Sequence, residues 1–218
     1  MQRGTFSKIM PKFASMNQST IIQDTDRIVW SENVIIVDGD YVDSVAFHLI
    51  VNFERMLGRR IPQADTARWI DCIALDGGIR QGEQQTQVVF IHDKASMALQ
   101  NFTPGNYQAD LDGKAFKDSL GEFVLSSFPV EEVVTHQDFV MDVFRLVTAQ
   151  KAVKRVMLVA DMDRLLEQVK SDLRLVDDES KRITVFAMQP LSGGHFRQEI
   201  LGYSLMNAMG ISADEFKQ

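Results

Sequence analysis

Two short apolar runs, each ending in a pair of aspartates, constrain this chain more than any other feature. Residues 34–40 (Val-Ile-Ile-Val-Asp-Gly-Asp) form one, and residues 156–163 (Val-Met-Leu-Val-Ala-Asp-Met-Asp) form the other. An apolar run this short, followed by a helical pattern, predicts a buried parallel strand. Parallel sheets place their sites at the carboxyl ends of the strands. If the two strands are neighbours, four acids meet in one crevice: Asp38, Asp40, Asp161 and Asp163.

Strand and helix patterns alternate along most of the chain. Strands are predicted at 33–38, 155–160 and 182–188, and helices at 42–57, 136–149, 163–174 and 196–209. Two more strands are predicted at 67–75 and 86–92, paired as a hairpin because no helical pattern separates them, and a further strand at 122–126. Residues 101–113 are predicted to be irregular, and the box Ser-Ala-Asp-Glu at 212–215 to start one more turn. This order predicts an α/β fold, a three-layer α/β/α sandwich around a mostly parallel, Rossmann-like sheet.

Length and composition predict one domain. The 218 residues, 45% of them hydrophobic, can fill a single core, which we place at 32–218 after an N-terminal arm at 1–31, with the helix at 196–209 packing on it. The net charge of -7 argues against broad attraction to nucleic acid or to an anionic membrane. The absence of an 18-residue apolar run or a signal-peptide core predicts a cytoplasmic protein with no membrane partner. The sequence gives no indication of the oligomeric state.

Helix capping explains part of the acidic pattern. An aspartate between a strand and a helix commonly accepts a hydrogen bond from a free N–H of the first turn. That role accounts for one acid of each pair, and it suits Asp38 poorly because Asp40 and Asp43 lie closer to the predicted helix start. The helix at 136–149 adds Asp142, which could pair with Arg145 or face the crevice.

Three segments resemble the NYN branch of the PIN-like metal-dependent ribonucleases. They are residues 37–42 (Val-Asp-Gly-Asp-Tyr-Val), 137–146 (Gln-Asp-Phe-Val-Met-Asp-Val-Phe-Arg-Leu) and 158–163 (Leu-Val-Ala-Asp-Met-Asp). The resemblance implies an acid cluster that holds Mg²⁺ or Mn²⁺ and hydrolysis of RNA by a metal-activated water. It implies metal ligands at Asp38, Asp40, Asp161 and Asp163, and catalytic roles for Asp38, Asp142, Asp161 and Asp163.

Two other interpretations remain open. The chain has Tyr41 where the family has Asn, and Val159-Ala160 where it has Ser-Gly, which favours a non-catalytic α/β module that binds a protein partner. The segment from Asp38 to Val42 also resembles the opening motif of haloacid-dehalogenase-like phosphatases. That resemblance implies a nucleophile at Asp38, an acid–base residue at Asp40, and supporting roles for Asp161 and for Lys151 or Lys154. No pair among the four histidines has zinc-ligand spacing, so we do not expect a zinc site.

Overall fold

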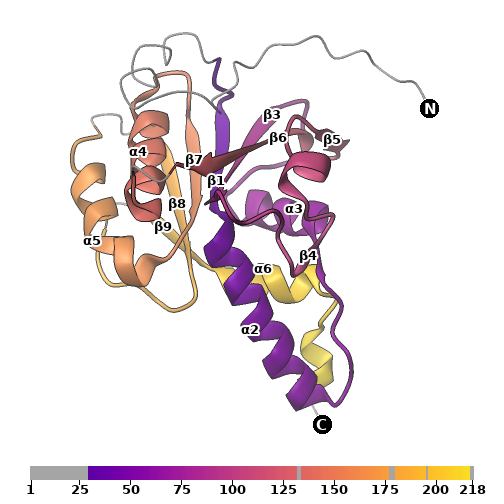
Figure 1. Cartoon of the computed structure of the whole chain (residues 1–218). Helices are drawn as coiled ribbons and strands as arrows, with labels where there is room; N and C mark the ends of the chain where they lie inside the picture. Colours follow the sequence, from indigo (N-terminus) through magenta and orange to yellow (C-terminus); the bar gives the residue numbers. More distant parts are fainter. Residues whose placement is uncertain (1–28, 132–133, 177–179, 195, 217–218) are drawn as a thin grey trace, which may run out of the picture.

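A seven-stranded sheet forms the centre of the computed structural model, which describes residues 29–131, 134–176, 180–194 and 196–216 (Figure 1). Its strand order is β5-β6-β3-β1-β7-β8-β9. Every neighbouring pair is parallel except β5–β6. The strands are β1 (Asn33–Asp38), β3 (Gln85–Asp93), β5 (Ala115–Asp118), β6 (Gly121–Val130), β7 (Arg155–Val159), β8 (Arg182–Ala187) and β9 (Arg197–Ile200), and a separate pair joins β2 (Ala64–Asp65) to β4 (Phe102–Thr103).

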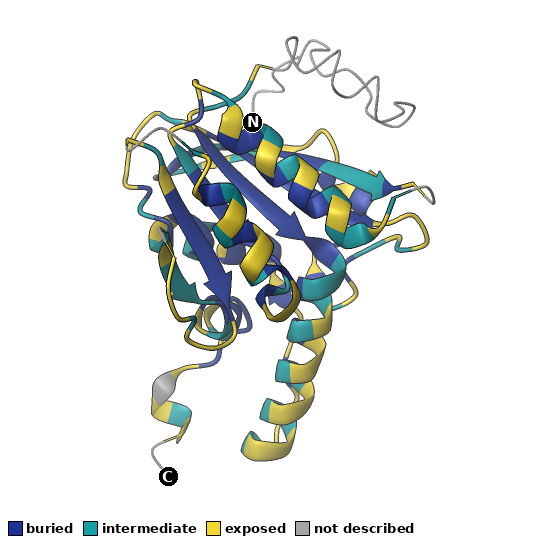
Figure 2. Cartoon of the chain, turned by 90° about the vertical axis from the view of Figure 1, so that its left-hand side faces the viewer, coloured by how far each residue is buried: buried dark blue, intermediate teal, exposed yellow. Residues whose placement is uncertain are grey.

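Helices cover both faces of the sheet. One face carries α2 (Gly39–Leu57), α3 (Thr66–Asp76) and α6 (Leu201–Ala208), and the other carries α4 (His136–Ala149) and α5 (Met162–Leu173). Successive residues of β1 alternate between the two cores: Ile35 packs with the first group and Ile36 with the second. Figure 2 shows the buried strands between more exposed helices. The predicted three-layer α/β fold is confirmed.

The two acid-bearing strands are parallel neighbours, as the sequence predicted. In β1 and β7, Ile35 pairs with Met157 and Val37 with Val159. The chain leaves β1 into α2 on one face and leaves β7 into α5 on the other. Connections that diverge from adjacent strands open a crevice at the carboxyl edge of an α/β sheet, where ligands bind.

The predicted strand at 67–75 is wrong, because these residues form α3. Asp65 caps this helix by accepting a hydrogen bond from Arg68 N (2.9 Å). The apolar run Trp-Ile-Asp-Cys-Ile-Ala suits either element, and the buried positions Trp69, Ile70 and Ile73 follow helical spacing. With a helix here, the predicted hairpin is also wrong, and β3 pairs in parallel with β1 instead.

The predicted helix at 196–209 is only half correct. Residues Arg197–Ile200 form the edge strand β9, paired in parallel with β8, and the helix α6 covers only Leu201–Ala208. The predicted irregular segment 101–113 contains β4 and a short π-helix at Tyr107–Leu111. The turn at Ala213–Phe216 follows the predicted box, since Ser212 N donates to Glu215 Oε1 (3.0 Å).

The predicted N-terminal arm lies mostly outside the described residues, which begin at residue 29. The last part of the arm contacts β3: Ser31 N donates to Gln87 Oε1, and Gln87 Nε2 donates to Val29 O, both at 3.0 Å. Within the part of the chain that the structure describes, no helix has both the length and the apolar character required to cross a membrane.

Candidate metal centre at the carboxyl end of the sheet

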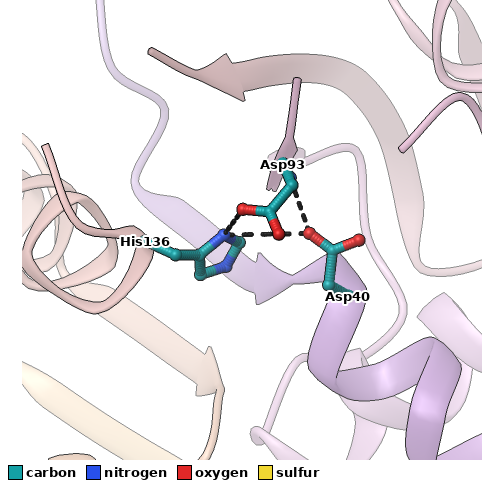
Figure 3. Close-up of side chains that lie close together, drawn as sticks. All are labelled: Asp40, Asp93 and His136. Carbon is teal, nitrogen blue, oxygen red and sulfur yellow. Dashed lines mark hydrogen bonds and ion pairs between the residues drawn. The ribbon is translucent and has the colours of Figure 1, made fainter. Parts of the chain in front are cut away.

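Acidic residues at the ends of three neighbouring strands lie at the carboxyl edge of the sheet. Asp38 ends β1, Asp93 ends β3, and Asp161 follows β7. His136, the first residue of α4, reaches into the same region, and Figure 3 shows it beside Asp40 and Asp93. Parallel strands bring these residues to one edge of the sheet, although Asp38 and His136 are 98 positions apart along the chain.

Asp38 is buried and has two partners. Its side chain is only 7% exposed, and Oδ1 accepts a hydrogen bond from Tyr41 N (3.0 Å) as the N-cap of α2. The same oxygen lies 2.9 Å from His136 Nε2. The capping role that the sequence assigned to Asp40 or Asp43 therefore belongs to Asp38, because α2 begins three residues earlier than predicted.

Asp40 and Asp93 connect α2 to the turn after β3. Asp40 Oδ2 accepts a hydrogen bond from Asp93 N (2.6 Å), and Oδ1 accepts one from Ser96 Oγ. The Asp93 carboxylate points back toward His136, with Oδ1 2.8 Å from Nδ1 of the ring. Its side chain is 60% exposed, so this side of the cluster is open to solvent.

His136 lies between carboxylates and carries a proton at neutral pH. Burial alone would lower its pKa, but hydrogen bonds and charge from Asp38 and Asp93 outweigh that effect and raise the pKa to about 9. Nδ1 also lies 3.7 Å from Asp40 Oδ2. The imidazolium thus partly neutralises the crevice from a position that is only 14% exposed.

Aromatic rings form the wall behind Asp40. The rings of His92 and Tyr107 stack with centroids 3.8 Å apart and planes 5° from parallel. Burial lowers the pKa of His92, and burial together with the charge of Asp40 raises the pKa of Tyr107, so both shifts favour the uncharged side chain. A Cβ at Gly39 would overlap the Tyr107 hydroxyl, so only glycine allows α2 to start this close to the wall.

Asp161 and Asp163 lie at the N-terminus of α5, at the same carboxyl edge of the sheet. Asp161 caps α5 by accepting from Asp163 N (3.1 Å), and its Oδ2 lies 3.2 Å from Arg164 Nε. Asp163 accepts from Gln189 Nε2 (3.1 Å) and lines a cavity of about 340 Å³. Burial, followed by the charges of these two acids and Asp38, raises the pKa of Tyr41 to about 12. Tyr41 therefore lies within the field of all three carboxylates.

Asp142 is engaged elsewhere. Its Oδ1 lies 3.0 Å from Arg145 Nη1, and Arg145 Nε donates to Asp172 of α5 (2.8 Å). Of the two roles considered for Asp142, pairing with Arg145 is therefore the one that fits these contacts. Lys151 and Lys154 precede β7, at the amino end of the strand that runs parallel to β1. The structure therefore contradicts the phosphatase-like placement of either lysine beside Asp38.

The cluster that is tight enough for one cation differs from the set predicted by the resemblance. Among the described residues, ligand atoms of Asp40, Asp93 and His136 all lie within 4.8 Å of one another, and of these only Asp40 was in the predicted metal set. Asp93 ends the apolar run 86–92 just as Asp38 ends its own, and this signal could have found it. A search for paired histidines could not find His136, because its partners are carboxylates on other strands.

Comparison with protein families gives one match. The model of a family described as "Family of unknown function (DUF6621)" matches residues 27–216, a range that includes all the helices and strands of the described residues. No curated protein and no solved structure matched the chain.

Proposed function

The chain belongs to the family of unknown function DUF6621, and we propose that it hydrolyses phosphodiester bonds in single-stranded RNA with Mn²⁺ or Mg²⁺ at the carboxyl end of the sheet. The observation that carries the proposal is the convergence of Asp40, Asp93 and His136, whose ligand atoms lie within 4.8 Å of one another. Ligands about 2.0–2.4 Å from one ion stand roughly 3–5 Å apart, so the three side chains fit a single cation.

The contacts of His136 also suit a metal ligand. Its Nε2 lies 2.9 Å from Asp38, and its Nδ1 points toward Asp93 and Asp40. A cation would displace the proton that Nδ1 carries in its absence. The neutral ring would then donate Nε2–H to Asp38 and present the Nδ1 lone pair to the metal, and such second partners orient histidine ligands in metal proteins. An imidazole among carboxylates suits Mn²⁺ better than Mg²⁺, which prefers oxygen ligands alone.

The surrounding residues suit a phosphodiester substrate. A divalent cation at this position would lower the pKa of a bound water and neutralise charge on a phosphate. Tyr41, with its pKa raised to about 12, keeps its proton and can donate a hydrogen bond to a phosphate oxygen. Arg164 pairs with Asp161 but is largely exposed, so it offers a positive charge at the rim, and exposed Asp93 leaves the substrate side open.

A second candidate function is a non-catalytic module that binds a protein partner. The observation in its favour is that the acids already have partners within the protein. Asp38 and Asp161 cap helices, Asp40 accepts a hydrogen bond from the turn after β3, and His136 supplies a positive charge. In that case the proton on His136 takes the place of the cation, and the acids serve the fold alone.

Thermal unfolding with and without MnCl₂ distinguishes the two candidates. A cation that binds only the folded state raises the melting temperature. We expect Mn²⁺ to stabilise the parent protein, Asp93→Asn to abolish that increase, and Asp161→Asn to reduce it only partly. Asp65→Asn is the matched control, because Asp65 caps α3 through Arg68 N, is not one of the three cluster residues, and asparagine caps helices equally well. An unchanged melting temperature in the parent would support the non-catalytic module.

Cleavage of a labelled single-stranded RNA pool tests the activity itself. Removing one metal ligand should lower the rate by a factor of about a hundred or more while the fold persists. We expect Mn²⁺-dependent cleavage by the parent and by Asp65→Asn, and loss of cleavage in Asp93→Asn. Equal cleavage by all three proteins would indicate a contaminating nuclease and would contradict the proposal.

A further inference from the structure

Four arginines gather at the opposite, amino end of the sheet. Arg155 and Arg182 begin β7 and β8 and are direct partners in the parallel register. Arg197 begins β9 opposite Thr184, two residues after Arg182, so all three side chains share one face of the sheet. Arg80 follows α3 on the same side, where its Nη1 donates to Leu75 O (3.0 Å) and Ile79 O (2.8 Å).

The guanidinium groups of Arg155 and Arg197 converge on one glycine. A Cβ built on Gly78 would lie 2.8 Å from Arg155 Nη1 and 3.9 Å from Arg197 Nη1. Arg155 Nη1 donates to Gly77 O (2.8 Å), whereas its Nε is buried without a partner among the residues described. A buried donor without an acceptor costs free energy, so Arg155 is held beside Gly77 at a cost.

Positive charge exceeds negative charge in this cluster. Arg197 pairs with Glu199 (2.6 Å), and Asp76 is close enough to both for their charges to act on its pKa, which burial raises. Within the described part of the chain, the guanidinium group of Arg182 has no hydrogen-bond or ion-pair partner. Burial lowers the pKa of Arg155, and the charges of Arg182, Arg80 and Arg197 lower it further, so each of the three repels Arg155.

We propose that this arginine cluster, defined by Arg80, Arg155, Arg182 and Arg197, binds the phosphate group of a small ligand. Guanidinium groups present parallel N–H donors that match the oxygens of phosphate, and a dianion would relieve the repulsion between register partners on adjacent strands. The proposal is independent of the metal centre, because the cluster lies at the other end of the strands.

Calorimetric titration of the full chain with inorganic phosphate tests the site. We expect saturable binding of phosphate, and no comparable heat with chloride at equal ionic strength. Arg182→Gln and Arg197→Gln should each weaken binding about tenfold or more, because each removes a charge-assisted contact. Both residues are exposed, so the variants should fold. Arg174→Gln, at the end of α5, removes the same charge elsewhere and should leave the affinity unchanged.

A second titration, with adenosine monophosphate, distinguishes a phosphate group carried by a larger ligand from free inorganic phosphate. Tighter binding than inorganic phosphate would indicate a phosphomonoester of a larger ligand, and equal binding would indicate free phosphate. Either result supports the site if Arg182→Gln weakens it. Absence of phosphate binding by the parent, or equal affinity in the parent and Arg182→Gln, would overturn the proposal.

Discussion

The two ends of the sheet differ in the sign of their charge and in how that charge is held. At the carboxyl end, Asp38 and Asp161 begin helices, and the half-buried imidazolium of His136 lies between Asp38 and Asp93. At the amino end, arginines cluster around the last turn of α3 and outnumber their acidic partners. Each set complements the helix dipole beside it, since helix N-termini favour negative charge and C-termini favour positive charge. A net charge of -7 thus describes neither end.

The largest expected change in stability comes from removing the charge pair at the carboxyl end of the sheet. His136→Ala would leave Asp38 buried with only its capping bond, which should lower the free energy of unfolding by about 2–3 kcal/mol at pH 7. Urea unfolding of metal-free protein measures the loss. Asp38→Asn in the His136→Ala background should recover part of it, because the amide carries no charge. If His136→Ala lowers the free energy of unfolding by less than about 0.5 kcal/mol, the pairing of His136 with Asp38 contributes no more than an exposed ion pair, which would contradict this prediction.

The pH dependence of stability sharpens the same point. Because the folded state raises the pKa of His136 from its ordinary value to about 9, the folded protein holds this proton more tightly than the unfolded chain. The stabilisation is complete below about pH 6.5 and is lost as pH rises through 9, with a total on the order of 2 kcal/mol. Unfolding in EDTA at pH 6, 7.5 and 9 measures it. His136→Asn should show a flatter profile over this range, and parallel profiles would disprove the assignment.

A smaller effect is expected from an acid on α3, close to the amino end. Burial, followed by the neighbouring Asp118, raises the pKa of Asp71 to about 7. The folded state therefore binds a proton that the unfolded chain releases near pH 4, and stability falls as pH rises from 4 through 7. Asp71→Asn should raise stability at pH 8 by on the order of 1 kcal/mol and change little at pH 4. Melting curves at both pH values test this, and equal shifts at the two would contradict it.

The smallest effect concerns repulsion among the arginines. In chloride buffer, Arg182→Gln removes a like charge directly beside Arg155 and should stabilise the fold by a few tenths of a kcal/mol. Arg174→Gln should not. Urea unfolding of both variants at low and high salt measures the difference, which salt should diminish. Destabilisation by Arg182→Gln would mean that its charge is already compensated.

The sequence predicted the parts of the molecule that depend on local pattern. Apolar runs located β1 and β7, and their common direction followed from the helices after them. The same rule failed at 67–75, where a continuous apolar run suits a buried helix as well as a strand. The contacts of Asp93 and His136 could not be predicted, because β3 and α4 bring them to Asp40 through pairing and packing that no short motif encodes.

The helix α2 is long enough to connect the carboxyl end of the sheet to the C-terminal turn. Its first turn is held by Asp38 and Asp40, and its second half projects beyond the sheet (Figure 1), where Phe53 meets Phe216 with ring centroids 5.7 Å apart. A rigid helix of 19 residues is about 28 Å long, so a tilt of about 5° at the crevice moves its far end by roughly 2 Å. Arg59, just beyond this end of α2, pairs with Glu215 (2.6 Å), so a tilt of the helix at Asp40 would strain this ion pair.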